Sequence, residues 1–379
     1  MMYIHRSLEN LVRKALKPNR AVIILGARRV GKTELIKNLL SNWDEPYMLL
    51  NGDDQMVQDL FEPRTQTNYQ RLLGNTRFLI IDEAQSISDV GMKLKLMLDT
   101  IPNLKVLVSG SSVFDLYNQL GEPLVGRKTT FSIFPLSQIE FSNTENVLET
   151  NQRLEERLIL GSYPELQQLS SKEEKIDYLM EIVNSYLLKD ILAFEGIRKR
   201  DVIVSLLRII AFRVGSEISI EGIANELQIG KATVDKYLDL FSKVFIIHKV
   251  TGFSRNLDNE ITKKNKWYFY DNGIRNALIN NFNGLNLRDD QGKLWENYLI
   301  SERLKRNEYQ RSHASHYFWR THTKQEIDWI EEQNGTLTAF EFKWNHKKVI
   351  KVPMLWRKSY PESSFEVIHT KNYLDFITS

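Results

Sequence analysis

The most restrictive feature of this sequence is residues 21–40, where an apolar run, a turn bearing two glycines and an amphipathic segment follow one another. Residues 21–25 are all apolar and predict a buried strand, and residues 34–40 continue as a helix. The octapeptide between them fits GxxxxGK[ST], a pattern whose backbone N–H groups and helix N-terminus favour a bound phosphate. The predicted phosphate-binding loop comprises Gly26, Ala27, Arg28, Arg29, Val30, Gly31, Lys32 and Thr33.

Two side chains of this loop have expected roles of their own. Lys32 should reach the β- and γ-phosphates of a nucleotide, and the Thr33 hydroxyl should ligate Mg²⁺. The alternative is a glycine-rich turn that begins an ordinary helix after a strand. The strand before the loop and the helix after it favour the nucleotide interpretation.

A second buried strand is predicted at residues 78–81, and it ends in two carboxylates, Asp82 and Glu83. Parallel strands deliver such groups to the carboxyl edge of a sheet, where the phosphate loop also lies. Beside that loop the pattern predicts a Walker B motif, with Asp82 holding Mg²⁺, usually through water, and Glu83 orienting the attacking water. The alternative is a strand that ends in solvated acids.

Farther along the chain, two polar features are candidates for contact with the γ-phosphate. A strand predicted at residues 105–108 ends in serines, of which Ser109 or Ser111 would act as a sensor of the phosphate or of the water. These serines would otherwise cap a helix expected over 113–120. Arg127 is a candidate for stabilising charge, in the same chain or from a neighbouring subunit, with a plain surface arginine as the alternative.

The overall composition indicates a globular chain of two or three domains. The chain has 379 residues, of which 42% are hydrophobic and 26% charged, and its formal net charge of +3 is too small to indicate a nucleic-acid partner. It contains no cysteine, which excludes disulfides and thiolate zinc sites and suits a reducing cytoplasm. With no apolar leader and no apolar run of about 18 residues, we expect neither export nor membrane insertion.

The motifs together resemble a large prokaryotic group of AAA-type ATPases. In that group an ATPase core precedes a domain of unknown function that contains a winged helix and a restriction-nuclease-like fold. The resemblance runs over nearly the whole chain and is carried by residues 26–33, 80–85, 108–112, 126–127, 134–136 and 161–165. It implies binding and hydrolysis of ATP, with a biological role that is largely unassigned. One departure is Ser109, where the group more often has threonine; the hydroxyl is kept.

Residues 218–241 predict a helix-turn-helix with its turn at Gly230, and strands expected at 244–250 and 266–270 would complete a winged helix. In a DNA-binding protein the second helix would enter the groove and the basic wing would contact phosphates. The candidate DNA contacts are Lys231, Thr233, Lys236, Arg255, Lys263 and Lys264. Winged helices also serve as packing modules, and Asp235 and Asp239 on the same helix oppose phosphate, so DNA binding stays open.

The C-terminal part places acids and a lysine in an order that resembles the PD-(D/E)xK nuclease fold. The candidate second metal site consists of Glu296 on a predicted helix, Asp328 on a strand, and Glu341 and Lys343 on the next strand. Because side chains alternate along a strand, Glu341 and Lys343 share one face, where Glu341 can share a metal with Asp328 while Lys343 acts on a water. The alternative is a structural or nucleic-acid-docking remnant of such a site.

These inferences predict an α/β protein with four parts. They are a three-layer P-loop core of the AAA type at 1–142, a helical lid at 143–200, a winged helix-turn-helix at 201–275, and an α/β restriction-nuclease-like domain at 276–379. We expect a cytoplasmic, Mg²⁺-dependent ATPase that couples ATP to its C-terminal half, with DNA, a protein or a second copy as candidate partners and no membrane. The rivals are an ATP-gated, Mg²⁺-dependent DNA endonuclease and a protein-binding signalling switch without nucleic-acid contact.

Overall fold

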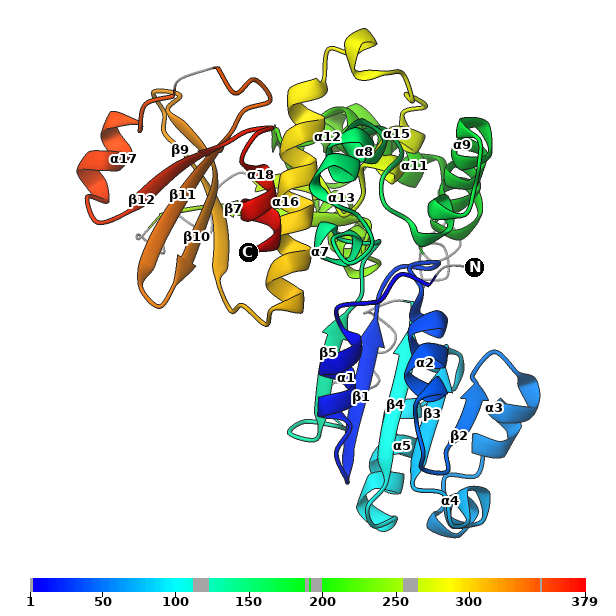
Figure 1. Ribbon diagram of the computed structural model, residues 1–379. Helices are drawn as coiled ribbons and strands as arrows, with labels where there is room; N and C mark the ends of the chain where they lie inside the picture. Colours follow the sequence, from blue (N-terminus) through cyan, green and yellow to red (C-terminus); the bar gives the residue numbers. More distant parts are fainter. Residues whose placement is uncertain (1–2, 112–122, 188–190, 192–199, 255–264, 348–349) are drawn as a thin grey trace. The chain divides into compact units, whose positions relative to one another are not determined.

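The structure is a computed structural model that describes residues 3–111, 123–187, 191, 200–254, 265–347 and 350–379 (Figure 1). Its chain divides into two compact units. The first comprises Met1–Leu136 together with Lys243–Phe245, and the second comprises Ser137–Ser242 and Ile246–Ser379. The helix expected over 113–120 lies outside the described residues.

The first unit is built on a parallel sheet of five strands in the order β2-β3-β4-β1-β5. The strands are β1 (Arg20–Leu25), β2 (Met48–Asn51), β3 (Phe78–Asp82), β4 (Lys105–Gly110) and β5 (Lys128–Ser132). The central strands β1, β3 and β4 are apolar without alternation, because both of their faces are covered. This confirms the predicted α/β fold with a parallel sheet, and it places β4 between the strands that precede the loop and the acid pair.

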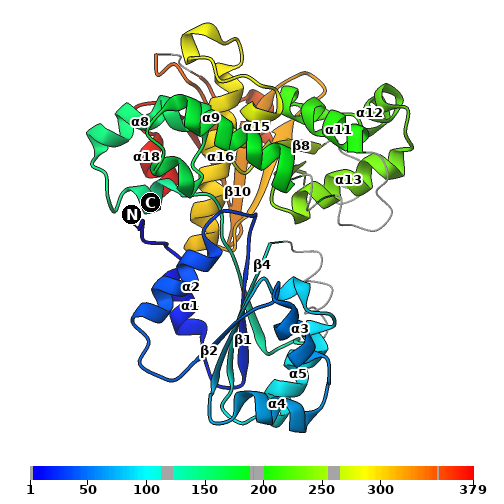
Figure 2. The same cartoon turned by 90° about the vertical axis from the view of Figure 1, so that its right-hand side faces the viewer.

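Helices cover both faces of this sheet. They are α1 (Glu9–Ala15), α2 (Lys32–Ser41), α3 (Gln55–Phe61), α4 (Gln66–Leu73), the 3₁₀ turn η1 (Ala84–Ser86) and α5 (Val90–Thr100). Figure 2 shows α1 and α2 on one face and α4 and α5 on the other. This arrangement gives the three layers that the sequence predicted for the core.

The second unit begins with helices. They are α7 (Gln138–Phe141), α8 (Val147–Leu160), η2 (Pro164–Gln167), α9 (Lys172–Glu181) and a π-helical turn, η3 (Ile182–Leu187). Helix α8 begins within the polar stretch of residues 143–149. Asn146 accepts N–H bonds from Leu148 and Glu149 at 2.9 and 3.0 Å, and the Glu149 carboxylate accepts one from Asn146, so a capping box starts α8 early.

A sheet of seven strands runs through the rest of the second unit in the order β12-β11-β10-β9-β7-β8-β6. The strands are β6 (Glu217–Ile218), β7 (Ile247–Gly252), β8 (Asn265–Phe269), β9 (Ser315–Arg320), β10 (Glu326–Gln333), β11 (Thr336–Phe342) and β12 (Ser364–Ile368). The helices are α11 (Arg200–Phe212), α12 (Ile220–Leu227), α13 (Lys231–Lys243), α15 (Asn272–Leu278), η4 (Leu285–Leu287), α16 (Gln291–Tyr309), α17 (Met354–Ser359) and α18 (Tyr373–Thr378). β7 and β9 join in parallel through Thr251–Tyr317 and Gly252–Phe318, so the sheet is continuous.

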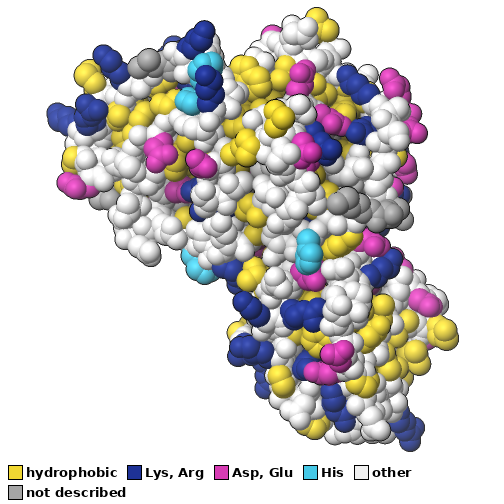
Figure 3. All heavy atoms as spheres, viewed as in Figure 1, with side chains coloured by type: hydrophobic (Ala, Val, Ile, Leu, Met, Phe, Trp, Pro, Cys, Tyr) yellow, Lys and Arg dark blue, Asp and Glu magenta, His cyan; other side chains and the backbone are white. Residues whose placement is uncertain are grey.

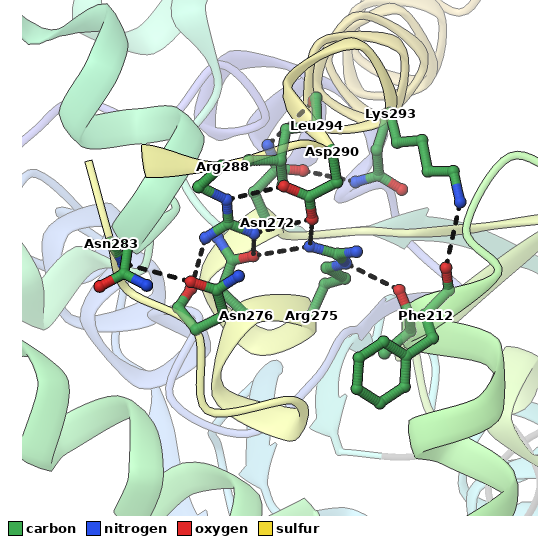
Figure 4. A network of polar contacts seen from close by, with 12 residues as sticks. Phe212, Asn272, Arg275, Asn276, Asn283, Arg288, Asp290, Lys293 and Leu294 are labelled. Carbon is green, nitrogen blue, oxygen red and sulfur yellow. Dashed lines mark hydrogen bonds and ion pairs between the residues drawn. The ribbon is translucent and has the colours of Figure 1, made fainter. Parts of the chain in front are cut away.

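Helix α15 is buried although its sequence is polar, because a hydrogen-bonded network satisfies its side chains (Figure 4). The buried Arg275 guanidinium donates to the Ala211 carbonyl at 2.8 Å and to Asp290 at 2.5 Å. Arg288 grips the other oxygen of Asp290 at 2.8 Å and also reaches Asn276 at 3.0 Å. The network therefore fixes the loop before α16 onto α15.

Candidate functional site

The loop at residues 26–33 has two residues in the left-handed region of the backbone and a glycine in close contact with the main chain. Gly31 and Arg29 have positive φ angles of 96° and 62°. A Cβ atom on Gly26 would lie 2.2 Å from the Ile133 carbonyl oxygen, so any side chain there would collide with the main chain. Lys32 opens α2, is only 4% exposed, and donates from Nζ to the carbonyls of Gly26 at 3.0 Å and Ala27 at 2.9 Å. The loop thus curls around the ammonium group expected to meet phosphate.

The hydroxyl of the loop and the first acid of β3 meet directly. Thr33 Oγ1 donates to Asp82 Oδ2 at 2.6 Å, although the two residues are far apart in sequence. The parallel sheet causes this meeting, because β1 and β3 bring their carboxyl ends to one edge. A hydroxyl and a carboxylate are oxygen donors of the kind that Mg²⁺ prefers, so this pair fits the expected ion.

The end of β4 completes the same edge. Ser109 Oγ donates to the second oxygen of Asp82 and accepts the Glu83 N–H at 3.2 Å. Glu83 itself has a positive φ of 51°, and its carbonyl sits so close to Gly52 that a Cβ there would lie 2.4 Å away. The structure therefore brings together Thr33, Asp82, Glu83 and Ser109, four of the residues predicted for this site.

Two residues at this edge were not among the predicted site residues. Gln85 donates from Nε2 to Glu83 Oε2 at 2.5 Å and to Ser111 at 3.4 Å, so its amide restrains the acid expected to orient water. Its position two residues after Glu83, directly after the predicted Walker B acids, is the sequence feature that could have identified it. Arg6, from the segment before α1, donates to the Val30 carbonyl at 2.5 Å. Nothing in the local sequence pattern pointed to it.

The role proposed for Arg127 at the phosphate of its own chain is corrected by the structure. Arg127 precedes β5, and its carbonyl accepts the Ala21 N–H at the start of β1. The loop follows the other end of β1, so the length of a strand separates it from Arg127. The guanidinium instead pairs with Asp99 near the end of α5. A role toward a neighbouring subunit is still a prediction.

The candidate DNA contacts are only partly described. Lys231 is exposed but forms an ion pair with Glu221 at 2.8 Å, and Lys236 is exposed beside the acidic Asp235 on α13. Thr233 lies in the first turn of that helix. Arg255, Lys263 and Lys264 lie outside the described residues. Figure 3 shows acidic and basic side chains together on the drawn face of both units, rather than a basic stripe.

The four residues of the candidate second metal site share one electrostatic neighbourhood in the second unit. Lys343 Nζ pairs with Glu341 at 2.6 Å, and Asp328 Oδ2 accepts the Phe342 N–H at 2.9 Å. Glu341 Oε2 is buried and has no hydrogen-bond donor among the described residues. Burial and the charge of Asp328 together raise the pKa of Glu341 to about 7. These carboxylates are therefore close enough to oppose one another's ionisation.

A lysine that the sequence did not single out fills this neighbourhood. Lys266 on β8 is 2% exposed, and its ammonium lies 2.6 Å from Glu326 and 3.6 Å from Glu296. Glu296 also accepts the Tyr268 hydroxyl at 2.6 Å. Burial and, to a smaller extent, the charge of Asp328 raise the pKa of Glu296 to about 7 against the opposing charge of Lys266.

The expected second metal site stays a prediction. No group of three or more His, Asp or Glu residues in the described part of the chain is placed to hold a metal ion. Lys266 and Lys343 contact the carboxylates instead. We refer to Lys266, Glu296, Glu326, Asp328, Glu341 and Lys343 as the carboxylate cluster.

Comparison with known families and structures agrees with the geometry of the first unit. Residues 18–142 match the model of an AAA domain. Over these residues the chain is similar to AAA-type P-loop domains. Residues 151–285 and 291–372 match two further models, each described as a domain of unknown function, DUF8612 and DUF4143. The predicted order of an AAA-type ATPase followed by a domain of unknown function is confirmed at this level.

Two similar proteins are described as uncharacterized. One from Methanocaldococcus jannaschii is 25% identical over 310 residues, covering 77% of this chain and 68% of its own. Another from Mycobacterium tuberculosis is 24% identical over 355 residues, covering 90% and 74%. A Walker-type ATPase of Pyrococcus abyssi superposes with a TM-score of 0.52 at 16% identity, covering 73% of this chain and 96% of that structure, which shows a shared fold. None of the helices described here is long and apolar enough to cross a membrane.

Proposed function

We propose that this protein binds ATP with Mg²⁺, hydrolyses it, and passes its nucleotide state to the second unit. The observation that carries the proposal is the 2.6 Å hydrogen bond between Thr33 and Asp82, next to a lysine buried inside the loop. In P-loop enzymes the threonine and the acid hold the same ion, and the lysine contacts the phosphates. Their convergence here is what a nucleotide-hydrolysing site requires.

The residues of the chain divide the chemical work. Thr33 and Asp82 would hold Mg²⁺, which when bound neutralises charge on the phosphate oxygens. Lys32 would leave the loop carbonyls for the phosphates, replacing neutral acceptors with anionic ones. Glu83 would orient the attacking water, while Gln85 restrains its carboxylate.

The test is a measurement of phosphate release beside a titration with a fluorescent ATP analogue. Glu83→Gln should bind nucleotide as tightly as the wild type but lose at least about 100-fold in phosphate release, the scale of removing a catalytic base. Glu34→Gln, an exposed acid on the neighbouring helix, is the matched control and should keep both activities. Normal turnover by Glu83→Gln would remove Glu83 from this role, and a wild type that binds no nucleotide would end the proposal.

We also propose that the second unit contains a winged helix and a helical lid. The order α11, β6, α12, α13, β7 and β8, with β8 pairing both β6 and β7, supports a winged helix. The helices of residues 143–200 that the structure describes, α8 and α9, support a helical lid. Because Lys231 is already paired with Glu221, DNA contact through α13 would have to break that pair.

A second candidate function is a Mg²⁺-dependent nuclease. It is favoured by the buried, unpaired Glu341 Oε2 beside Asp328 and opposed by the ammonium group of Lys266. Asp328→Ala and Lys343→Ala should then abolish nicking of a supercoiled plasmid with Mg²⁺ or Mn²⁺ and keep ATPase activity. No nicking by the wild type would exclude this candidate. If duplex and single-stranded DNA also show no salt-dependent retardation, the signalling switch with a protein partner is favoured.

A further inference from the structure

Arg6 is a buried arginine whose two terminal guanidinium nitrogens both donate hydrogen bonds to main-chain carbonyls. The residue is 5% exposed. Nη1 donates to the Val30 carbonyl at 2.5 Å, and Nη2 donates to the Phe134 carbonyl at 2.6 Å. A planar fork of donors holds two acceptors in a fixed relative position. Arg6 therefore fastens the nucleotide loop to a segment more than a hundred residues away in sequence.

The bond to Val30 constrains a group that a phosphate would use. Val30 lies between Arg29 and Gly31, both of which have positive φ angles. A trans peptide is planar, so its C=O and the following N–H point in opposite directions. Since Arg6 fixes the direction of the Val30 carbonyl, it also fixes the Gly31 N–H, which belongs to the set of loop donors expected to face phosphate.

The bond to Phe134 lies where the chain leaves the first unit. That unit ends at Leu136, and Ser137 begins the second. The preceding residue, Ile133, donates its N–H to Leu25 at 2.7 Å and presents its carbonyl to Gly26. The exit segment, residues 132–136, thus meets the loop twice, once at Gly26 and once through Arg6.

The aromatic ring of Phe134 has its own contact. It meets the ring of Phe245 edge-on at 5.9 Å and 71°. Phe245 belongs to Lys243–Phe245, the short stretch between α13 and β7 that clusters with the first unit. A displacement of Phe134 would therefore move the residues that lead to Ser137 and would also change the contact with Phe245.

We propose that Arg6 is a positioning residue that sets the nucleotide loop and couples the state of the loop to the exit segment. This rests on the proposed function, because it assumes that the loop binds nucleotide. Binding draws the N–H groups of the loop toward phosphate, and the peptide of Val30 turns with them. The guanidinium passes that turn to Phe134 through its hydrogen bond to the Phe134 carbonyl.

The test compares Arg6→Ala and Arg6→Lys with Arg13→Ala in the full chain. Arg13 is the matched control, since it also donates to two main-chain carbonyls of the first unit, those of Leu39 and Asn42, both at 3.2 Å. The titration uses a fluorescent ATP analogue with Mg²⁺. Arg6→Ala should bind the analogue roughly 10- to 100-fold more weakly, the scale of lost charged hydrogen bonds. Arg6→Lys should lose several-fold and Arg13→Ala less than about two-fold.

Coupling is measured by hydrogen exchange of peptides that cover residues 131–141, with and without saturating non-hydrolysable ATP. Wild type and Arg13→Ala should gain protection with nucleotide, whereas Arg6→Ala at saturation should not. A purely structural role would lower the melting temperature without removing that difference. If Arg6→Ala does not fold, Arg6→Lys must show the same loss in part.

Unchanged affinity and unchanged protection in the folded Arg6 variants would overturn the inference while leaving the ATPase proposal intact. A wild type that binds no nucleotide would overturn both, and the two failures are therefore distinguishable.

Discussion

The nucleotide site and the carboxylate cluster each contain a buried lysine, and the contacts described for the two lysines differ. Lys32 donates to neutral carbonyls of its own loop, while Asp82 accepts from the hydroxyls of Thr33 and Ser109. Lys266 is instead ion-paired with Glu326 and lies near Glu296. Hydrogen bonds to neutral carbonyls, such as those described for Lys32, can be exchanged for a charged ligand at small cost, whereas the ion pairs of Lys266 must first be broken.

The largest effect is expected from a substitution in the nucleotide site. Lys32→Ala should weaken binding of an ATP analogue by at least about 100-fold, because a buried charge that pairs with phosphate is lost. The nucleotide-dependent rise in melting temperature should disappear with it. Lys37→Ala is the control on the same helix, as Lys37 is exposed and pairs only with Glu34 among the contacts described for it. A normal affinity of Lys32→Ala would show that the loop does not bind nucleotide in the proposed way.

A substitution of Lys266 tests whether its ion pairs stabilise the carboxylate cluster. Lys266→Met should destabilise the chain by about 3–5 kcal/mol in urea unfolding, because buried carboxylates are left without their ammonium partner. Lys249→Ala, an exposed lysine on β7, should change little. If the Lys266 ammonium occupies the place that a metal ion would take, Mn²⁺ should raise the melting temperature of Lys266→Met but not that of the wild type. If Mn²⁺ changes the melting temperature of neither protein, the carboxylate cluster binds no metal ion even without Lys266, unlike the nucleotide site.

The pH dependence of stability sharpens the same contrast. Glu296 and Glu341 have pKa values of about 7 in the folded chain, whereas the ordinary pKa of a glutamate is 4.5. Between these values the folded state binds more protons than the unfolded state, so the free energy of unfolding falls as pH rises from about 4.5 to 7. The expected loss is about 3 kcal/mol for each carboxyl group that titrates with this shift. Glu296→Gln should flatten this slope, and the exposed control Glu366→Gln should not; equal slopes in both would contradict the assignment.

The network of Figure 4 gives an intermediate case, in which an acid is fully paired. Burial alone would raise the pKa of Asp290, but Arg288 and Arg275 lower it to about 2. Its stabilisation is present above the ordinary pKa of aspartate and is lost as pH falls through about 2. Asp290→Asn should cost about 2 kcal/mol at neutral pH, while its exposed neighbour, Asp289→Asn, serves as the control. An equal cost for both would show that the ion pairs are not the source.

The smallest effect is expected at Arg127. Its pair with Asp99 is exposed, with side-chain exposures of 49% and 37%, so Arg127→Ala should change stability by less than about 1 kcal/mol. Nucleotide affinity should stay within about two-fold of the wild type. A fall in phosphate release that depends on protein concentration would instead favour a role of Arg127 toward a neighbouring subunit.

Sequence patterns predicted the parts of the fold and site that depend on neighbours in the chain. The apolar runs before Gly26 and Asp82 allow little except buried parallel strands, and parallel strands bring their ends together. Thr33, Asp82 and Ser109 were therefore predictable as a group. Helix α15 was not, because its polar residues resemble a turn until Asp271 accepts the N–H groups of Gly273 and Ile274.

Arg6 and Lys266 could not be predicted because their roles exist only after folding. Arg6 is separated from Val30 by 24 residues and from Phe134 by 128, and its partners are carbonyls that every residue possesses. Lys266 lies on a strand predicted as part of a wing, where a basic residue would ordinarily face solvent. Only the continuous sheet of the second unit turns it toward acids on α16 and β10.

The parallel joining of β7 to β9 has a consequence for synthesis of the chain. While the ribosome is still adding residues beyond β8, one edge of β7 has no neighbour, since Tyr317 and Phe318 have not yet emerged. The Phe253 N–H waits for the Phe318 carbonyl, which it meets at 2.6 Å in the finished protein. Incomplete chains would offer that edge to one another, and pairing with β9 removes the open edge.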